Sequence, residues 1–176
     1  DLKYVIDQKA LSLEQIRHFH SKQFPLYQWS AVDVNSRFKL MAYSDQKSWT
    51  NGPTFFLWVL SWLRSHGVSV PIVFTVDRGE EFGGKSWLKL IELRKLLSGF
   101  GCSIIQNHAA SPQENAHVER SHRTDDEEFY IPRLLSIPYK KDFFLEAMNY
   151  LYYYNVVRKH SCLQRRSSWE HLVTVS

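Results

Sequence analysis

The pattern of apolar and polar positions along the chain predicts strands and helices in mixed order, without internal repeats. Strands are expected where apolar residues alternate with polar ones or form short continuous runs, and helices where apolar residues recur every three to four positions. The expected strands are 1–7, 27–33, 38–43, 71–76 and 102–106, and the expected helices are 12–20, 54–66, 85–98, one that starts at 111, 141–157 and 169–173.

Local signals refine four of these elements. Ser12 is a favourable cap for the first helix, and the sequence Ser111-Pro112-Gln113-Glu114 combines a cap, a first-turn proline and a capping-box glutamate. The run 71–76 is continuously apolar, which predicts a strand buried on both faces. The helix over 54–66 is expected to be amphipathic and to end at Gly67, with one apolar face made by Phe55, Trp58, Val59 and Trp62.

The order of these elements predicts an α/β fold, because a hairpin of two strands is followed by strand–helix–strand units. With 176 residues, of which 44% are hydrophobic, the chain is expected to form one domain. Residues 141–176 would be a helical extension of that domain. The chain starts at Asp1 without an initiator methionine and enters a strand at once, so we expect it to be a fragment of a longer protein.

Composition narrows the classes of protein only a little. A net charge of +4 is compatible with a polyanionic partner. The apolar runs are too short to cross a bilayer, and neither a signal peptide nor a lipidation motif is present, so no membrane partner is expected. Cys102 and Cys162 are best interpreted as free thiols in a reducing cytosol.

Three carboxylates stand where they could serve chemistry. Asp1 opens the first strand, Asp77 follows the apolar strand, and Glu119 lies inside the helix that starts at 111. Oxygen clusters suit Mg²⁺ or Mn²⁺, and two such ions can stabilise an in-line phosphoryl displacement. Spacing alone leaves the choice open, and the acidic run 125–128 is interpreted as a solvated helix face. The competing acids are Asp7, Asp33, Glu80, Glu81, Glu114, Asp126, Glu127 and Glu128.

Several segments, in the right order, resemble the catalytic core of DDE-type integrases and bacterial insertion-sequence transposases. Residues 75–83 (TVDRGEEFG) resemble the T-D-N-G-x-E-F segment around the second catalytic aspartate, and residues 111–123 (SPQENAHVERSHR) resemble the segment that ends in the third acid. Residues 1–3 (DLK) resemble the first-acid motif. Residues 27–37 (YQWSAVDVNSR) and 154–163 (YNVVRKHSCL) resemble the D-x-x-S-R hairpin and the downstream Y-N-x-x-R-x-H-x-x-L pattern.

The resemblance implies an RNase H-like mixed five-stranded sheet flanked by helices, and an enzyme that cleaves DNA and transfers strands during transposition or integration. It implies that Asp1, Asp77 and Glu119 hold the catalytic metal, Mg²⁺ or Mn²⁺, as two ions in that family's manner. Asp33 would then be structural. Arg78 departs from the family's asparagine, and the interval between Asp77 and Glu119 is longer than in many members.

The expected partners are transposon-end and target DNA, bound by a homodimer or a higher assembly in the bacterial cytoplasm, associated with the nucleoid. Phosphate contacts are expected from Arg120, Arg123, Lys85, Arg158 and Lys159. Two other functions stay open: a catalytically inactive integrase-like module that binds DNA or protein, and an RNase H-like nuclease that does not join strands. Metal binding would distinguish the first alternative, and a strand-joining assay the second.

Overall fold

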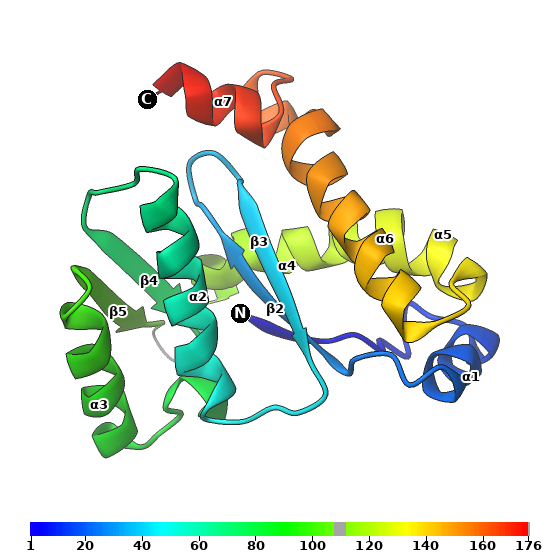
Figure 1. Cartoon of the computed structure of the whole chain (residues 1–176), viewed down its shortest axis with the longest axis horizontal. Helices are drawn as coiled ribbons and strands as arrows, with labels where there is room; N and C mark the ends of the chain where they lie inside the picture. The colour runs from blue at the N-terminus through cyan, green and yellow to red at the C-terminus, as the bar shows by residue number, and fades with distance from the viewer. Residues whose placement is uncertain (108–111, 176) are drawn as a thin grey trace. The chain divides into compact units, whose positions relative to one another are not determined.

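Two units make up the chain. The computed structural model describes the backbone of residues 1–107 and 112–175, with the side chains of all of these except 112–115 and 175. The first unit comprises Asp1 and Gln46–Ala116, and the second comprises Leu2–Asp45 and His117–Ser176. Each unit contains its own sheet (Figure 1). Among the described residues, no helix is both long enough and apolar enough to cross a membrane.

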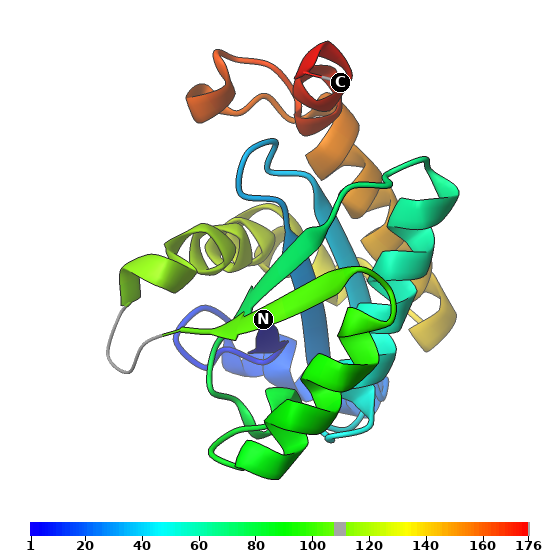
Figure 2. The same ribbon diagram turned by 90° about the vertical axis from the view of Figure 1, so that its left-hand side faces the viewer.

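The first unit is built on two parallel strands, β4 (Ile72–Val76) and β5 (Cys102–Gln106). Parallel strands need a crossover connection, and α3 (Trp87–Ser98) provides it. Figure 2 shows the two strands side by side with α3 against them. The helix α2 (Asn51–Ser65) precedes β4 and ends before Gly67, whose positive φ of 83° is suited to glycine.

The buried face of α2 differs from the predicted one. Trp58 is 41% exposed, so its expected place on the apolar face is wrong. The face is instead set by Phe56, whose ring lies 4.8 Å from that of Phe74 in β4 and 5.5 Å from that of Phe82. The buried residues of α2 are Gly52, Phe55, Phe56, Val59 and Leu60, of which Gly52, Val59 and Leu60 lie three or four positions from Phe56.

The strand β4 is buried on one face only, so the prediction of burial on both faces is wrong. Phe74 and Val76 point to the face that packs on α2, and Val76 is buried. Val73 and Thr75 lie on the opposite face and are exposed, Val73 by 56%. The alternation of strand side chains separates the two faces, and a continuous apolar run does not reveal which of them is covered.

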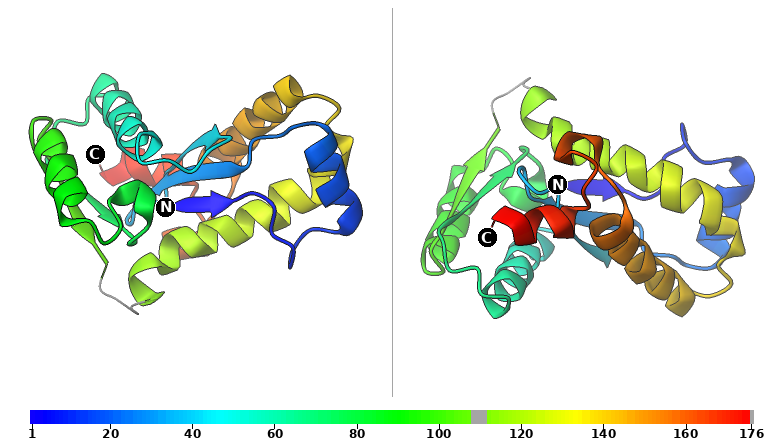
Figure 3. Two further views of the ribbon diagram at one scale, coloured as in Figure 1. Left: turned by 90° about the horizontal axis from the view of Figure 1, so that it is seen from below. Right: turned by 90° about the horizontal axis from the view of Figure 1, so that it is seen from above.

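The second unit is built on an antiparallel sheet in the order β1-β2-β3. Its strands are β1 (Leu2–Tyr4), β2 (Tyr27–Val32) and β3 (Lys39–Ser44), so the predicted hairpin is confirmed. The helix α4 runs beside β1 (Figure 3), where Nζ of Lys3 donates a hydrogen bond to the backbone oxygen of His122. The helical segments of this unit are α1 (Leu13–Ser21), α4 (Pro112–Asp125), the π-helical turn η2 (Asp126–Tyr130), α5 (Ile131–Arg133), the 3-10 turn η3 (Leu134–Ser136), α6 (Lys140–Tyr152), the π-helical turn η4 (Tyr153–Val157), the 3-10 turn η5 (Ser161–Leu163) and α7 (Ser168–Val175).

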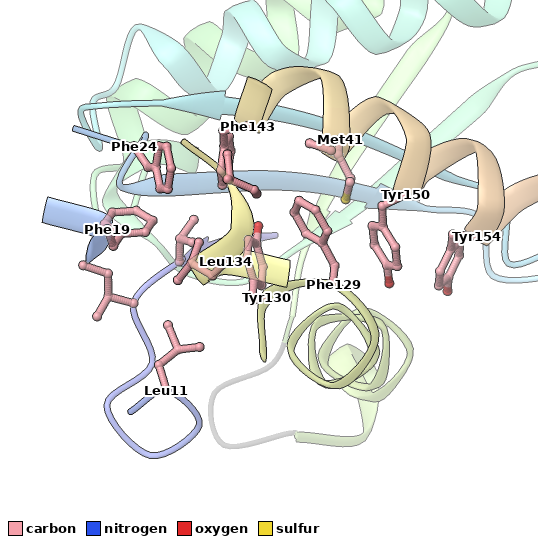
Figure 4. Close-up of a cluster of buried hydrophobic side chains, with 14 residues drawn as sticks. Leu11, Phe19, Phe24, Met41, Phe129, Tyr130, Leu134, Phe143, Tyr150 and Tyr154 are labelled. Carbon is pink, nitrogen blue, oxygen red and sulfur yellow. The ribbon is translucent and has the colours of Figure 1, made fainter. Parts of the chain in front are cut away.

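Aromatic rings dominate the core of the second unit, between the sheet, the helices α1 and α6 and the π-helical turn η2 (Figure 4). The rings of Phe24 and Phe143 stack with their centroids 5.0 Å apart, and those of Phe129 and Tyr150 stack at the same distance. Stacked pairs of this kind contribute about 0.5–1.5 kcal/mol beyond the area that they bury. Among the aromatic residues in and after the predicted helix 141–157, Phe143, Tyr150 and Tyr154 are therefore core residues, whereas Phe144, Tyr152, Tyr153 and Trp169 are exposed.

The observed fold has the expected α/β class but differs from the expected single sheet. The mixed α/β class is confirmed, and Ser12 caps α1 in a reciprocal capping box with Gln15. The strand pairing shows a sheet of three strands and a sheet of two, rather than one sheet of five. The capping box expected at Ser111 and Glu114 lies outside the residues and side chains that the structure describes.

Candidate catalytic carboxylates and basic residues

The turn after β4 fixes the carboxylate of Asp77 at the carboxyl end of the strand. Asp77 is half-buried, and its Oδ1 accepts a hydrogen bond of 3.0 Å from the N–H of Gly79. This side-chain bond builds a tight turn and leaves the second carboxylate oxygen for another ligand. Open α/β sheets commonly place ligand-binding residues at this end of their parallel strands. Asp77 therefore has the position and the chemistry of a cation ligand.

Arg78, which departs from the family pattern, ties this turn to the neighbouring strand. Its Nε donates a hydrogen bond of 3.1 Å to the backbone oxygen of Asn107, just beyond β5. The N–H of Asn107 in turn donates to the backbone oxygen of Val76 at 2.8 Å, which continues the parallel ladder. The substitution thus leaves the hydrogen bonding of the turn intact.

The two glutamates that follow Gly79 have different surroundings. Glu80 is exposed, whereas Glu81 is only 2% exposed, and Nζ of Lys47 lies 3.1 Å from its Oε2 without hydrogen-bond geometry. A Cβ atom at Gly79 would lie 2.5 Å from Oε1 of Glu81, so the glycine makes room for the buried carboxylate. Phe82 is fully buried. Glu81 and Phe82 thus anchor the segment on which Asp77 stands, in the short 3-10 helix η1 (Glu80–Phe82).

The other two predicted carboxylates lie on different elements. Asp1 is half-buried and groups with the first unit, which also contains Asp77. Glu119 is exposed on α4 and belongs to the second unit. Within either unit, the described residues contain no group of three or more His, Cys, Asp or Glu side chains that could hold a metal ion. The triad of Asp1, Asp77 and Glu119 therefore stays a prediction that draws on both units.

The five predicted DNA-binding residues fall into two groups. Lys85, Arg120 and Arg123 are exposed. Arg158 is half-buried, and its Nε donates to both carboxylate oxygens of Glu128 at 2.9 Å; burial lowers the pKa of Arg158, but these bonds outweigh it and raise the pKa. Lys159 donates to Glu170 at 2.6 Å and lowers the pKa of that carboxyl. Arg158 and Lys159 thus already have carboxylate partners within the chain.

Sequence reasoning missed a buried network of charged and polar groups, because the run 125–128 was expected to be solvated. That expectation is wrong for Asp125 and Asp126, which are buried. Asp125 accepts two bonds of 2.5 Å from Nζ of Lys39, and its partner is equally inaccessible to solvent. It also accepts bonds from Gln28 at 2.7 Å and from the hydroxyl of Tyr150 at 2.9 Å. Burial, as the largest cause, lowers the pKa of Lys39.

One signal could have indicated this network. Asp125 precedes Phe129 by four positions, and residues four apart share a helix face. The face that buries Phe129 in the aromatic core therefore buries Asp125 as well. A second aspartate, Asp126, forms an ion pair with Lys3 of β1. These contacts join α4 and η2 to the sheet.

No protein-family model matches the sequence, and no curated protein matches it. The fold, by contrast, is similar to that of a chain in the cryoEM structure of the simian T-cell lymphotropic virus intasome in complex with PP2A regulatory subunit B56 gamma. The two chains are 13% identical, with a TM-score of 0.55 over 82% of this chain. The match spans 48% of the other chain, about half of its length. The likeness therefore lies in the fold, which resembles that of a chain from a viral intasome complex.

Proposed function

We propose that this chain is the catalytic core of a DDE-type transposase or integrase, which cleaves DNA and joins strands by direct in-line phosphoryl transfer. The observation that carries the proposal is the fixed carboxylate of Asp77 at the carboxyl end of β4, in the segment whose sequence resembles the second-acid motif. The likeness in fold to a chain from an intasome complex supports the same proposal.

The donor atoms fit the metal that the resemblance implies. All three proposed ligands are carboxylates, which suit Mg²⁺ or Mn²⁺ rather than zinc. Asp77 uses one oxygen for the turn, and Glu119 is exposed on its helix. Asp1 and Asp77 would hold one ion, and Asp1 and Glu119 would hold a second. When bound, two such ions activate the attacking water or 3′-hydroxyl and neutralise charge on the leaving oxygen.

The remaining residues of the proposed site bind and orient DNA. Exposed Lys85, Arg120 and Arg123 would contact phosphates, which makes binding strongly dependent on salt. The attacking hydroxyl comes from water or from a DNA end, so no covalent bond forms between the protein and DNA. We expect the chain to act as a dimer or a larger assembly on DNA.

The experiment uses a branched DNA oligonucleotide in which a 3′-hydroxyl faces a phosphodiester, because strand joining within it needs no recognition of transposon ends. Asp77→Asn and Glu119→Gln are expected to lower the rate in Mn²⁺ at least about a hundredfold, since each removes a ligand that contributes several kcal/mol to the transition state. The matched controls, Glu80→Gln and Glu127→Gln, change exposed carboxylates and should keep the rate.

Two outcomes would overturn the assignment. A Glu119→Gln variant with near-native joining would remove Glu119 from the triad. If the unaltered chain and the Asp77→Asn variant bound Mn²⁺ equally well, Asp77 would be removed from the triad. This second readout needs neither DNA nor activity. Hydrolysis without joining would favour a nuclease.

A further inference from the structure

The second unit contains a cavity of about 150 Å³ with a strongly basic lining. One buried water needs only about 10–15 Å³, so the cavity has room for a larger ligand. Its walls come from the turn between β2 and β3, from α4 and from the segment after α6. They carry the side chains of Arg37, His117, Arg120, Tyr154, Arg158 and His160, with Ser and Thr hydroxyls and Cys162 around them.

Two motifs that the proposed catalysis does not use meet at this cavity. Arg37 ends the D-x-x-S-R motif, and Tyr154, Arg158 and His160 belong to the Y-N-x-x-R-x-H motif. These motifs lie at opposite ends of the sequence, yet both contribute to the same wall lining. Their meeting at one cavity suggests a shared role for the two motifs.

The first motif holds Arg37 in a costly conformation. Oδ2 of Asp33 accepts hydrogen bonds from the N–H of Ser36 at 2.7 Å and from its hydroxyl at 2.6 Å, and the N–H of Arg37 donates to the backbone oxygen of Asp33 at 2.9 Å. Arg37 has a φ of 62°, in the left-handed region that favours glycine. A residue with a side chain strains the backbone at such a position, which points to a use for the side chain of Arg37.

The second motif holds its side chains rigidly. Glu128 fixes Arg158, whose Nη1 lies 3.3 Å from Nδ1 of His160. The other ring nitrogen of His160 lies 3.3 Å from the hydroxyl of Ser168. The wall is therefore already organised before any ligand binds.

The cavity has an excess of positive charge and an unused donor. Glu128 offsets Arg158, but no carboxylate is found among the described residues that line the cavity. Nη1 of Arg37 is buried, and no described residue accepts a hydrogen bond from it. Burial lowers the pKa of His117, and the charges of Arg37 and Arg120 lower it further. A buried donor without an acceptor is destabilising, and an anionic ligand would supply the missing acceptor.

We propose that this cavity binds one phosphate group of a DNA strand, with Arg37 as the central ligand. Arginine guanidinium groups match the oxygens of a phosphate with paired hydrogen bonds. DNA is the expected source because Arg120 at the cavity and Arg123 one turn along α4 present further exposed guanidinium groups to a strand. In its choice of DNA as ligand, the inference rests on the proposed function; the phosphate chemistry follows from the cavity itself.

The test measures binding of a fluorescein-labelled DNA duplex by anisotropy over a range of salt concentrations, in EDTA, so that catalysis plays no part. Arg37→Gln is expected to weaken binding roughly tenfold or more and to lower the slope of log K against log salt by about one. Arg17→Gln, which removes the same charge from an exposed position on α1, is the matched control and should change both quantities far less. Arg37→Gly guards against misfolding, because glycine suits the backbone at this position.

Equal affinities for Arg37→Gln, Arg37→Gly and Arg17→Gln would overturn the inference. Inorganic phosphate serves as a second probe, followed by the NMR signals of the His117 and His160 rings. If phosphate shifts these signals only when Arg37 is present, while DNA affinity does not depend on Arg37, the ligand is free phosphate and the DNA assignment is wrong. Because binding is measured in EDTA, its outcome does not depend on metal-dependent catalysis, so failure of the catalytic proposal and failure of this one are distinguishable.

Discussion

Removal of the Lys39 charge is expected to destabilise the second unit far more than removal of a surface lysine. The side chains of Lys39 and Asp125 are both inaccessible to solvent and lie 2.5 Å apart. Lys39→Met keeps the apolar stem but leaves Asp125 as a buried carboxylate without its counter-ion. Breaking one side of a buried pair typically costs about 3–5 kcal/mol. The hydrogen bonds from Gln28 and Tyr150 to Asp125 remain in this variant and partly stabilise the carboxylate, so the expected loss stays within that range.

The assay is urea unfolding followed by tryptophan fluorescence and circular dichroism, to which Trp29, only 2% exposed in the second unit, contributes. With an m value of about 2 kcal/mol per molar urea, the expected loss lowers the midpoint by roughly 1.5–2.5 M. The control is Lys140→Met, which breaks a 3.0 Å pair with Asp45 at the surface and should cost at most about 1 kcal/mol.

The double variant Lys39→Met/Asp125→Asn provides an internal check on the cause. Gln28 and Tyr150 donate to different oxygens of Asp125, so asparagine keeps an acceptor for one of them. Because asparagine also has no charge, the double variant should recover part of the stability lost by Lys39→Met. If Lys39→Met were no less stable than Lys140→Met, the buried pair would not stabilise the fold as argued. If the double variant lost as much stability as the two single variants added together, unpaired charge would not be the cause.

Two further predictions concern packing and pH. A Cβ atom at Gly52 would lie 2.0 Å from the backbone oxygen of Glu81, so Gly52→Ala should lower the free energy of unfolding by about 1–3 kcal/mol in thermal melts. The control is Gly99→Ala, which should be neutral or slightly stabilising. Gly99 has a right-handed backbone conformation, and the nearest atom to its added Cβ would lie at 3.5 Å. Burial lowers the pKa of His160 below 6.5. As the pH falls below 6.5, the unfolded chain therefore takes up a proton on this histidine that the folded chain does not. The stability that neutral His160 contributes is thus present above that pH and lost below it. The stability deficit of His160→Gln should therefore shrink in urea titrations below pH 6.5, and a deficit independent of pH would contradict the reasoning.

The candidate site was only partly accessible to sequence reasoning. The placement of Asp77 after a strand followed from the apolar run and the turn residues, and the structure shows the bond to Gly79 that such a turn needs. The sequence did not show that Arg158 and Lys159 pair with carboxylates within the chain, because folding brings Glu128 and Glu170 to them. Charge in a sequence does not show which charges are already paired.

The sequence by itself determined the elements whose signals are local: α1 with its capping box at Ser12, the hairpin of β2 and β3, and the end of α2 at Gly67. These depend on periodicity, caps and turns over a few residues. Only the tertiary structure decided which face of β4 is covered, that Lys39 meets Asp125 across 86 positions, and that two distant motifs line one cavity. The physical reason is that burial and charge pairing depend on neighbours far apart in the chain, to which local patterns are blind.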